Sequence, residues 1–177
     1  VYKRQHPCRW NYKLVEETRP GEYMDVFENE RGTFIFNSKD LCTIRHIPEL
    51  VQSGIASLKI EGRVKTSYYV ATVVGAYRRE IDRYCADPEN YVFNEAEYEE
   101  LCKVSHRPYT TGFYFGKPDE NSQVYTSSSY IRDYDLIGIV KDYDEKTGIA
   151  TITQRNRFFK GDEIEIIQPM KPFFVQT

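Results

Sequence analysis

The chain has 177 residues, of which 40% are hydrophobic, 29% charged and 15% aromatic, as in globular proteins and unlike disordered or fibrous ones. Its formal net charge of −3 predicts no general attraction to nucleic acid or anionic membranes, although a local basic patch is compatible with it. No apolar run approaches the roughly 18 residues of a membrane span, and the first residues lack the apolar core of a secretory signal. The four cysteines are widely spaced, so we expect reduced thiols and a cytoplasmic protein.

The two ends of the sequence lead us to expect a fragment of a longer protein. Residues 1–5 (VYKRQ) resemble the translation of a sequencing-library adapter, so we set them aside as non-native. Residues 169–177 end inside an extended, aromatic stretch without a polar tail.

The first half of the chain shows short apolar runs followed by helical periodicity. Alternation over residues 11–36, with turn signals near 19–22 and 28–32, predicts a β-hairpin or two short strands. A strand near residues 33–37 is followed by a short helix over 44–52, which Gly54 ends as a left-handed cap. A second strand over 57–61 leads into a long helix from about residue 67 to 84, with Thr66 or Ser67 as its cap.

The order strand, helix, strand, helix predicts parallel strands joined by crossover helices. Two such units cannot bury both faces of a sheet, and a (β/α)₈ barrel needs about 250 residues. We therefore expect residues 1–108 to be the last two βα units of a TIM-type (β/α)₈ barrel, with the other strands upstream.

The second half changes to the two-residue period of strands. After a short helix over 94–102, capped by Asn94, a hairpin loop is predicted at residues 144–148. Strands are predicted at 112–115, 123–127, 136–143, 149–154 and 162–167. This spacing predicts a small antiparallel β-barrel domain over residues 109–177, truncated at its end.

Charged side chains cluster at the end of the second predicted barrel strand. Lys59, Glu61 and Arg63 lie where barrel enzymes place their chemistry. Charges at alternate positions of a buried strand are costly unless paired, so they indicate either catalysis or an ion-pair network. As catalytic residues, Lys59 and Glu61 would act as acid, base or substrate anchors, and Arg63 would clamp an anionic group.

The equivalent loop one unit earlier holds a second polar group. Asn37 and Lys39 are candidates for substrate binding and Asp40 for catalysis, with ordinary loop structure as the alternative. His106 lies in the predicted interdomain segment. It either binds substrate or makes a structural hydrogen bond that holds the two domains together.

Basic and aromatic residues alternate in the predicted second domain. Arg155 and Arg157 precede Phe158, Phe159 and Lys160. This pattern suits binding of an RNA backbone with stacking of its bases. The alternative is a hairpin core with solvated charges.

Five short motifs resemble the peptidase U32 family in order and spacing, over residues 7 to about 172. They are residues 7–12 (PCRWNY), 37–42 (NSKDLC), 57–63 (SLKIEGR), 103–112 (KVSHRPYTTG) and 154–159 (QRNRFF). The family carries a collagenase-like peptidase label, and some of its members are linked to hydroxylation of tRNA or ribosomal RNA.

The resemblance implies an iron–sulfur cluster held by four cysteines. Cys8 and Cys42 match two of these ligands, and the other two would lie upstream, so we expect no cluster in this fragment. The family often has a further cysteine four positions before Cys8, where this chain has Arg4. Without the resemblance, the spacing alone favours two buried thiols that act as small hydrophobic residues.

The resemblance favours an intact enzyme of tRNA or ribosomal RNA hydroxylation, with RNA as its partner. A collagenase-like peptidase acting on a peptide is the alternative, and a non-catalytic RNA- or protein-binding module is a third possibility. The sequence contains no HExxH or GxSxG motif and no Cys/His pair typical of a protease. It gives no indication of the oligomeric state.

Overall fold

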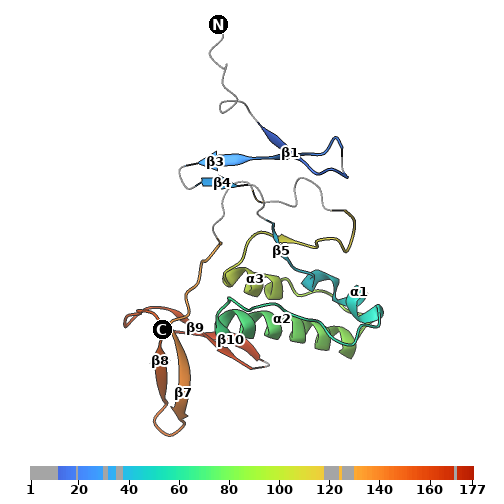
Figure 1. The fold of residues 1–177 in the computed structure, drawn as a ribbon. Coiled ribbons are helices and arrows are strands. Elements are labelled where there is room, and N and C mark those ends of the chain that lie inside the picture. Colours follow the sequence, from blue (N-terminus) through green and yellow to red (C-terminus); the bar gives the residue numbers. More distant parts are fainter. Residues whose placement is uncertain are drawn as a thin grey trace. The chain divides into compact units, whose positions relative to one another are not determined.

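The computed structural model describes residues 12–18, 20–29, 32–34, 38–117, 124, 130–169 and 171–177. These residues fall into two compact units. The first runs up to Cys42 and includes Arg107–Tyr130, and the second comprises Thr43–His106 and Ile131–Thr177. Figure 1 shows the order of the elements along the chain.

Two antiparallel hairpins open the first unit. Strand β1 (Lys13–Val15) pairs with β2 (Tyr23–Asp25), and β3 (Phe27–Asn29) pairs with β4 (Gly32–Phe34). Gly21, in the predicted turn between β1 and β2, has a φ of +95°, which glycine adopts without strain. The predicted hairpin is therefore confirmed. The predicted parallel strand near 33–37 is wrong over β4, which pairs antiparallel with its neighbour, and residues 35–37 lie outside the described part.

A short parallel ladder joins two distant segments of the first unit. Strand β5 (Asp40–Leu41) pairs with β6 (Tyr109–Thr110). The N–H of Asp40 donates to the carbonyl of Pro108 (3.0 Å), and the N–H of Cys42 donates to that of Thr110 (2.8 Å). Parallel strands require a long crossover, and here the intervening chain contains three helices.

Helices form the centre of the second unit, and their ends follow the predicted caps. A 3₁₀ turn at Ile44–His46 leads into α1 (Ile47–Gln52), after which Gly54 has a φ of +76° and donates its N–H to Val51. Helix α2 (Ser67–Ala86) begins after Thr66, whose hydroxyl accepts the N–H of Tyr69 at 3.2 Å. Helix α3 (Glu95–Lys103) begins after Asn94, whose side chain accepts the N–H of Ala96 at 3.3 Å. All three predicted helices are confirmed.

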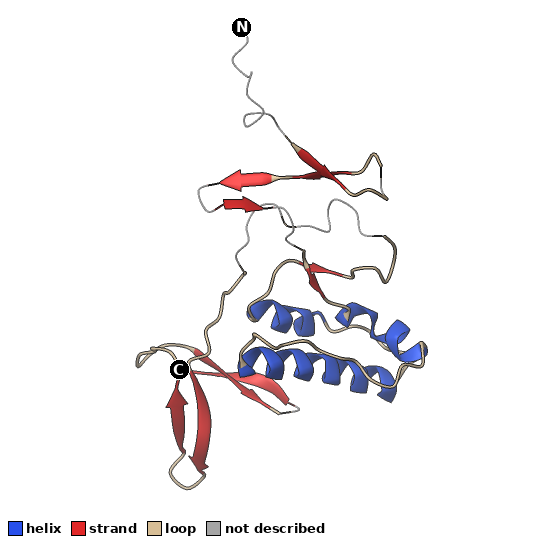
Figure 2. Ribbon diagram, viewed as in Figure 1, coloured by secondary structure: helices blue, strands red, loops and turns tan. Residues whose placement is uncertain are grey.

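An apolar cluster holds α1 against α2. Ile47 and Leu50 from α1 are buried with Tyr84 from α2, and both α1 and α3 lie along α2 in Figure 2. Leu58 packs against this cluster although residues 57–61 form no strand. The predicted strand over 57–61 is therefore wrong. A strand needs a hydrogen-bonded neighbour, and none lies beside this segment in the described residues.

A buried ion pair joins α2 to α3. The guanidinium of Arg79 makes three contacts with the carboxylate of Glu97, with N–O distances of 2.9, 3.1 and 2.6 Å. The fully buried Glu80 accepts the hydroxyl of Tyr91 at 2.7 Å and pairs with Arg83 at 2.9 Å. Polar contacts therefore supplement the apolar packing on this side of α2.

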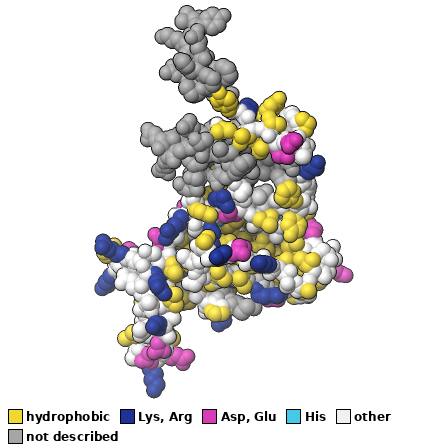
Figure 3. Space-filling view, in the orientation of Figure 1, with side chains coloured by type: hydrophobic (Ala, Val, Ile, Leu, Met, Phe, Trp, Pro, Cys, Tyr) yellow, Lys and Arg dark blue, Asp and Glu magenta, His cyan; other side chains and the backbone are white. Residues whose placement is uncertain are grey.

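Two hairpins end the second unit. Strand β7 (Gly138–Asp144) pairs antiparallel with β8 (Ile149–Gln154), and β9 (Ile164–Gln168) with β10 (Lys171–Gln176). The predicted hairpin at 144–148 is confirmed, with Gly148 at a φ of +69°. In Figure 3 hydrophobic, basic and acidic side chains all lie on the surface of the β7–β8 hairpin.

The remaining strand predictions have different outcomes. Residues 112–115, a predicted strand, form turns, and Gly112 has the positive φ of +59° that such a turn favours. The predicted strand at 123–127 lies outside the described residues except for Val124. Overall, the described residues form a mixed α/β structure of small two-stranded sheets, and no closed barrel forms among them. Both barrels remain predictions. In the described ranges, no helix combines the length and apolarity needed to cross a membrane.

Candidate functional site

Asp40, a predicted catalytic residue, is held by Arg107. Its Oδ1 lies 3.1 Å from the Nε of Arg107, and its Oδ2 accepts the backbone N–H of the same residue at 2.9 Å. Both side chains are about one quarter exposed. The neighbouring Lys39 is half-buried, and no ion pair to it is seen within the described ranges. Asn37 lies outside them.

Cys42 follows β5 directly, and its thiol is half-buried and outside any disulfide. Its predicted partner Cys8 lies outside the described residues. Among the residues that are described, no three potential metal ligands converge. This part of the chain therefore supplies a single candidate thiolate and does not form a cluster site by itself. Cys85 is exposed on α2, and Cys102 is half-buried on α3.

Lys59, Glu61 and Arg63 are all exposed in the irregular segment before α2. The carboxylate of Glu61 accepts the backbone N–H of Arg63 at 2.9 Å. No ion pair of Lys59 or Arg63 is seen in the described part. The predicted ion-pair network is therefore absent from these residues, and their exposed charges need no pairing.

His106 is buried, with 5% of its surface exposed. Its Nδ1 lies 2.7 Å from the carbonyl of Val104, which can only accept, so Nδ1 carries the proton. Its backbone also exchanges two hydrogen bonds with Ile131, at 3.2 and 2.7 Å. His106 thus makes structural contacts within the second unit, and its role in substrate binding stays a prediction.

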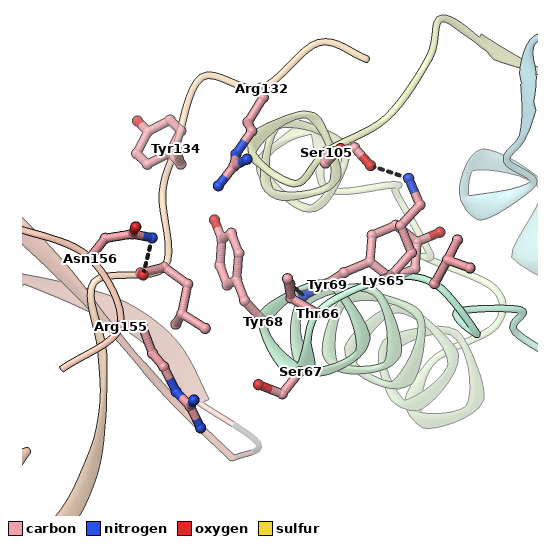
Figure 4. A pocket seen from close by; sticks show the side chains of 12 residues that line it. Lys65, Thr66, Ser67, Tyr68, Tyr69, Ser105, Arg132, Tyr134, Arg155 and Asn156 are labelled. Atoms are coloured by element: carbon pink, nitrogen blue, oxygen red, sulfur yellow. Dashed lines mark hydrogen bonds between the residues drawn. The ribbon is translucent and has the colours of Figure 1, made fainter. Parts of the chain in front are cut away.

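A cavity of about 460 Å³ opens at the start of α2, within the second unit. Four segments line it: the entry to α2, the residue Ser105 after α3, the chain from Arg132 to Leu136, and the two residues that follow β8. Its lining residues are Val64, Lys65, Thr66, Ser67, Tyr68, Tyr69, Ser105, Arg132, Tyr134, Leu136, Arg155 and Asn156. In Figure 4 the guanidinium of Arg132 lies beside the hydroxyl of Tyr68, and that of Arg155 lies on the opposite side of Tyr68, toward Ser67.

Three cationic side chains line this cavity. The ammonium of Lys65 donates to the carbonyl of Ser105 at 2.7 Å. Arg132 pairs with the exposed Asp135 at 2.5 Å. Arg155 is exposed, and no contact of its guanidinium is seen in the described ranges. The cavity therefore carries an excess of positive charge.

Tyrosine rings form the apolar part of the lining. Tyr68 is half-buried, and Figure 4 shows its ring rising from α2 with its hydroxyl toward Arg132. Burial, and then the carboxylates of Glu100 and Glu165, raise the pKa of the Tyr68 hydroxyl, so it stays protonated at neutral pH.

Of the catalytic, binding and metal-ligand candidates that the structure describes, only Arg155 lines the cavity; Arg157 does not. Lys65, Tyr68 and Arg132 were missed. Lys65 gave a usable signal, because a lysine directly before a capped helix start lies where anions are often bound. Arg132 gave none, since the fold brings it to the cavity from a distant segment.

Residues 4–124 of the chain match peptidase family U32, and residues 132–177 match the C-terminal domain of that family. The chain belongs to peptidase family U32. The U32 cavity is thus lined from both matched regions, by Lys65 and Tyr68 from the first and by Arg132 and Arg155 from the second.

Curated U32 relatives have two kinds of name. The chain is 43% identical over 170 residues to tRNA hydroxylation protein P1 of Bacillus subtilis, covering 96% of this chain and 40% of that protein. It is 37% identical over 158 residues to tRNA hydroxylation protein P of Escherichia coli, covering 89% and 34%. It is 29% identical over 174 residues to a collagenase of Porphyromonas gingivalis, covering 96% and 40%. No solved structure matches the chain.

Proposed function

We propose that the protein containing this chain is a U32 enzyme that takes part in the hydroxylation of tRNA. The observation that carries the proposal is the 43% identity to tRNA hydroxylation protein P1 over 170 residues. Since the chain spans 40% of that relative, the activity and substrate of the whole protein are part of the proposal. Ribosomal RNA is the related substrate against which tRNA must be tested.

Several exposed residues are suited to contact RNA. Lys59 and Arg63 are solvent-exposed cations. They can approach phosphate groups without first giving up an ion pair seen among the described residues. Glu61 is the candidate acid or base of the same segment, and Asp40 is a second candidate whose oxygens already accept from Arg107.

We further propose that the complete protein carries an iron–sulfur cluster with Cys8 and Cys42 among its ligands. The exposed end of β5 supports this for Cys42, whose thiol is half-buried and outside any disulfide. When bound, the cluster would supply one-electron redox chemistry. A (β/α)₈ barrel of the complete protein that ends near residue 108, a C-terminal β-barrel and a cytoplasmic location belong to the same proposal.

A peptidase is the second candidate function. The 29% identity to a collagenase over 174 residues favours it. Against it, the sequence has no recognised protease motif. A non-catalytic binding module is the third class, and it predicts RNA or peptide binding without any chemical change.

The test is to delete the gene in its host and to analyse nucleosides from purified tRNA and ribosomal RNA by mass spectrometry. We expect a tRNA nucleoside with one additional oxygen atom to disappear and to return on complementation. Loss of such a nucleoside from ribosomal RNA alone would identify ribosomal RNA, and not tRNA, as the substrate. An unchanged nucleoside profile, with cleavage of denatured collagen by the purified protein, would replace the proposal with the peptidase.

A further inference from the structure

The cavity at the start of α2 has the size of a small-ligand site, but its rim is exposed to solvent. Its volume of about 460 Å³ lies within the range of about 300–1,000 Å³ typical of ligand pockets. Ser67, Arg155 and Asn156 on its rim are all exposed, so the bound group need not be enclosed. One unit of a longer chain can therefore enter while its neighbours remain outside.

The charges of the cavity favour an anionic unit. Arg132 and Arg155 line the cavity on opposite sides of Tyr68, from segments about twenty residues apart, and Lys65 adds a third cation. Arginine is the side chain best suited to phosphate, because its planar guanidinium can donate two parallel hydrogen bonds. The first turn of α2 adds to the positive potential of the cavity. The hydroxyl of Thr66 accepts the N–H of Tyr69, but helix geometry gives the backbone N–H groups of Ser67 and Tyr68 no acceptor within the helix.

Nearby acidic groups only partly offset this field. Glu100 and Glu165 lie close enough to influence Tyr68, but both pair with the ammonium of Lys103, at 2.6 and 2.9 Å. Asp135 pairs with Arg132, and both side chains are about 60% exposed. An exposed pair of this kind is weak, so an incoming phosphate can take over the arginine.

The aromatic lining adds a surface for a flat ring. Tyr68 and Tyr134 both line the cavity beside the arginines. Proteins bind single-stranded RNA by combining cationic contacts to phosphates with stacking of bases on aromatic rings. A peptide would provide neither the regular anionic charge nor a flat base.

We propose that this cavity is an anchoring subsite for one unstacked nucleotide of the substrate RNA, with its base on Tyr68 and the two phosphates that flank it on Arg132 and Arg155. The inference rests on the proposed function and deepens it, because it specifies a single-stranded region of the RNA as the part that is held. The subsite positions RNA and takes no part in the chemical step.

The experiment uses the complete gene product and fluorescent tRNA, with binding measured over a series of salt concentrations. We expect Arg132→Ala with Arg155→Ala to weaken binding by at least about tenfold and to reduce the slope of log K against log salt by about 1.4. Lys141→Ala removes an exposed charge of β7 outside the cavity and should leave both quantities close to the parent values.

Two further variants test the geometry in other directions. Asp135→Asn releases Arg132 from its ion pair, so we expect binding to become about twofold to threefold tighter. Tyr68→Ala should weaken binding by about tenfold through lost stacking, whereas Tyr68→Phe, which keeps the ring, should not. Circular dichroism of each variant confirms that it is folded.

The outcomes separate this inference from the proposed function. Competition by an oligonucleotide of single-stranded RNA, but not by an RNA duplex, supports the subsite. Two results overturn the subsite even where tRNA hydroxylation is confirmed. One is equal competition by the duplex, and the other is a variant with both Arg132→Ala and Arg155→Ala that binds tRNA as tightly as Lys141→Ala does. If the same variants lose affinity for a denatured collagen peptide but keep their affinity for tRNA, the cavity is a peptide site and the inference is overturned. A parent protein that neither binds nor hydroxylates tRNA removes the proposed function itself.

Discussion

Arg107 binds Asp40 twice, through its backbone N–H at 2.9 Å and through its Nε at 3.1 Å. The contact lies beside the parallel ladder of β5 and β6, where Asp40 itself donates to the carbonyl of Pro108. A carboxylate that accepts both a backbone and a side-chain donor is fixed in position. Asp40 therefore has a structural task in the first unit in addition to the catalytic role predicted from the sequence.

This relationship predicts coupling between the two residues. We expect Asp40→Ala to lower the free energy of unfolding by about 1–2 kcal/mol, because it removes the carboxylate that accepts from both the N–H and the guanidinium of Arg107. Arg107→Ala should lose a similar amount, and the double variant should lose less than the sum by about 1 kcal/mol. Urea denaturation of the four proteins measures the cycle, and strict additivity would show that the contact contributes nothing.

The ion pair between α2 and α3 offers a matched comparison on one helix. Arg79 and Glu97 are 19% and 8% exposed, whereas their neighbours Arg78 and Asp82 form a pair that is about half exposed. We expect Glu97→Ala to destabilise the protein by about 2–3 kcal/mol, because it leaves the mostly buried guanidinium of Arg79 without this partner. Asp82→Ala should cost less than about 0.5 kcal/mol. Thermal unfolding of the two variants tests the difference, and equal losses would contradict it.

The turn of the β7–β8 hairpin predicts a local response to acid. The N–H of Lys146 and the hydroxyl of Thr147, both at 2.9 Å, lower the pKa of the Asp144 carboxyl below its usual value. Because the folded pKa is depressed, the stabilisation is present above the unfolded pKa of about 3.9 and is lost as the pH falls through the folded value. NMR titration of the carboxyl carbon should show this low pKa. In Asp144→Asn the turn should lose its acid sensitivity, and a normal pKa in the parent protein would refute the prediction.

Local signals in the sequence predicted the helices and the main hairpin, since each depends on neighbours in the chain. Thr66 and Asn94 cap α2 and α3 through their own side chains, and Gly54 ends α1 with a positive φ. Gly148 does the same for the hairpin turn. Capping and turn chemistry act within a few residues, so a single sequence is enough to read them.

Features that depend on distant partners could not be predicted in this way. Residues 57–61 have a strand-like pattern, but a strand forms only beside another strand. The pairing of Asp40 with Tyr109 joins segments almost seventy residues apart, and no local pattern marks it. The cavity likewise depends on Arg132, which chain folding brings to Tyr68. The site residues predicted from motifs remain predictions until they are tested by substitution.

The last prediction concerns the proposed cluster. In the complete gene product, purified without oxygen, we expect iron and sulfide together with a visible absorption band. Cys42→Ser should remove most of the iron and the band, because a hydroxyl is a much poorer ligand than a thiolate for cluster iron. Cys8→Ser should have the same effect if both thiols bind the same cluster. Iron content and absorbance measure this without reference to activity.

The chain provides two matched controls for these cysteine variants. Cys85 is exposed on α2 and Cys102 is half-buried on α3, so each tests the loss of a thiol outside the proposed ligand set. We expect Cys85→Ser and Cys102→Ser to keep the parent amounts of iron and sulfide. If Cys42→Ser also keeps them, then Cys42 is not a ligand. Its half-buried thiol at the end of β5 would then contribute only to packing, as a small hydrophobic side chain does.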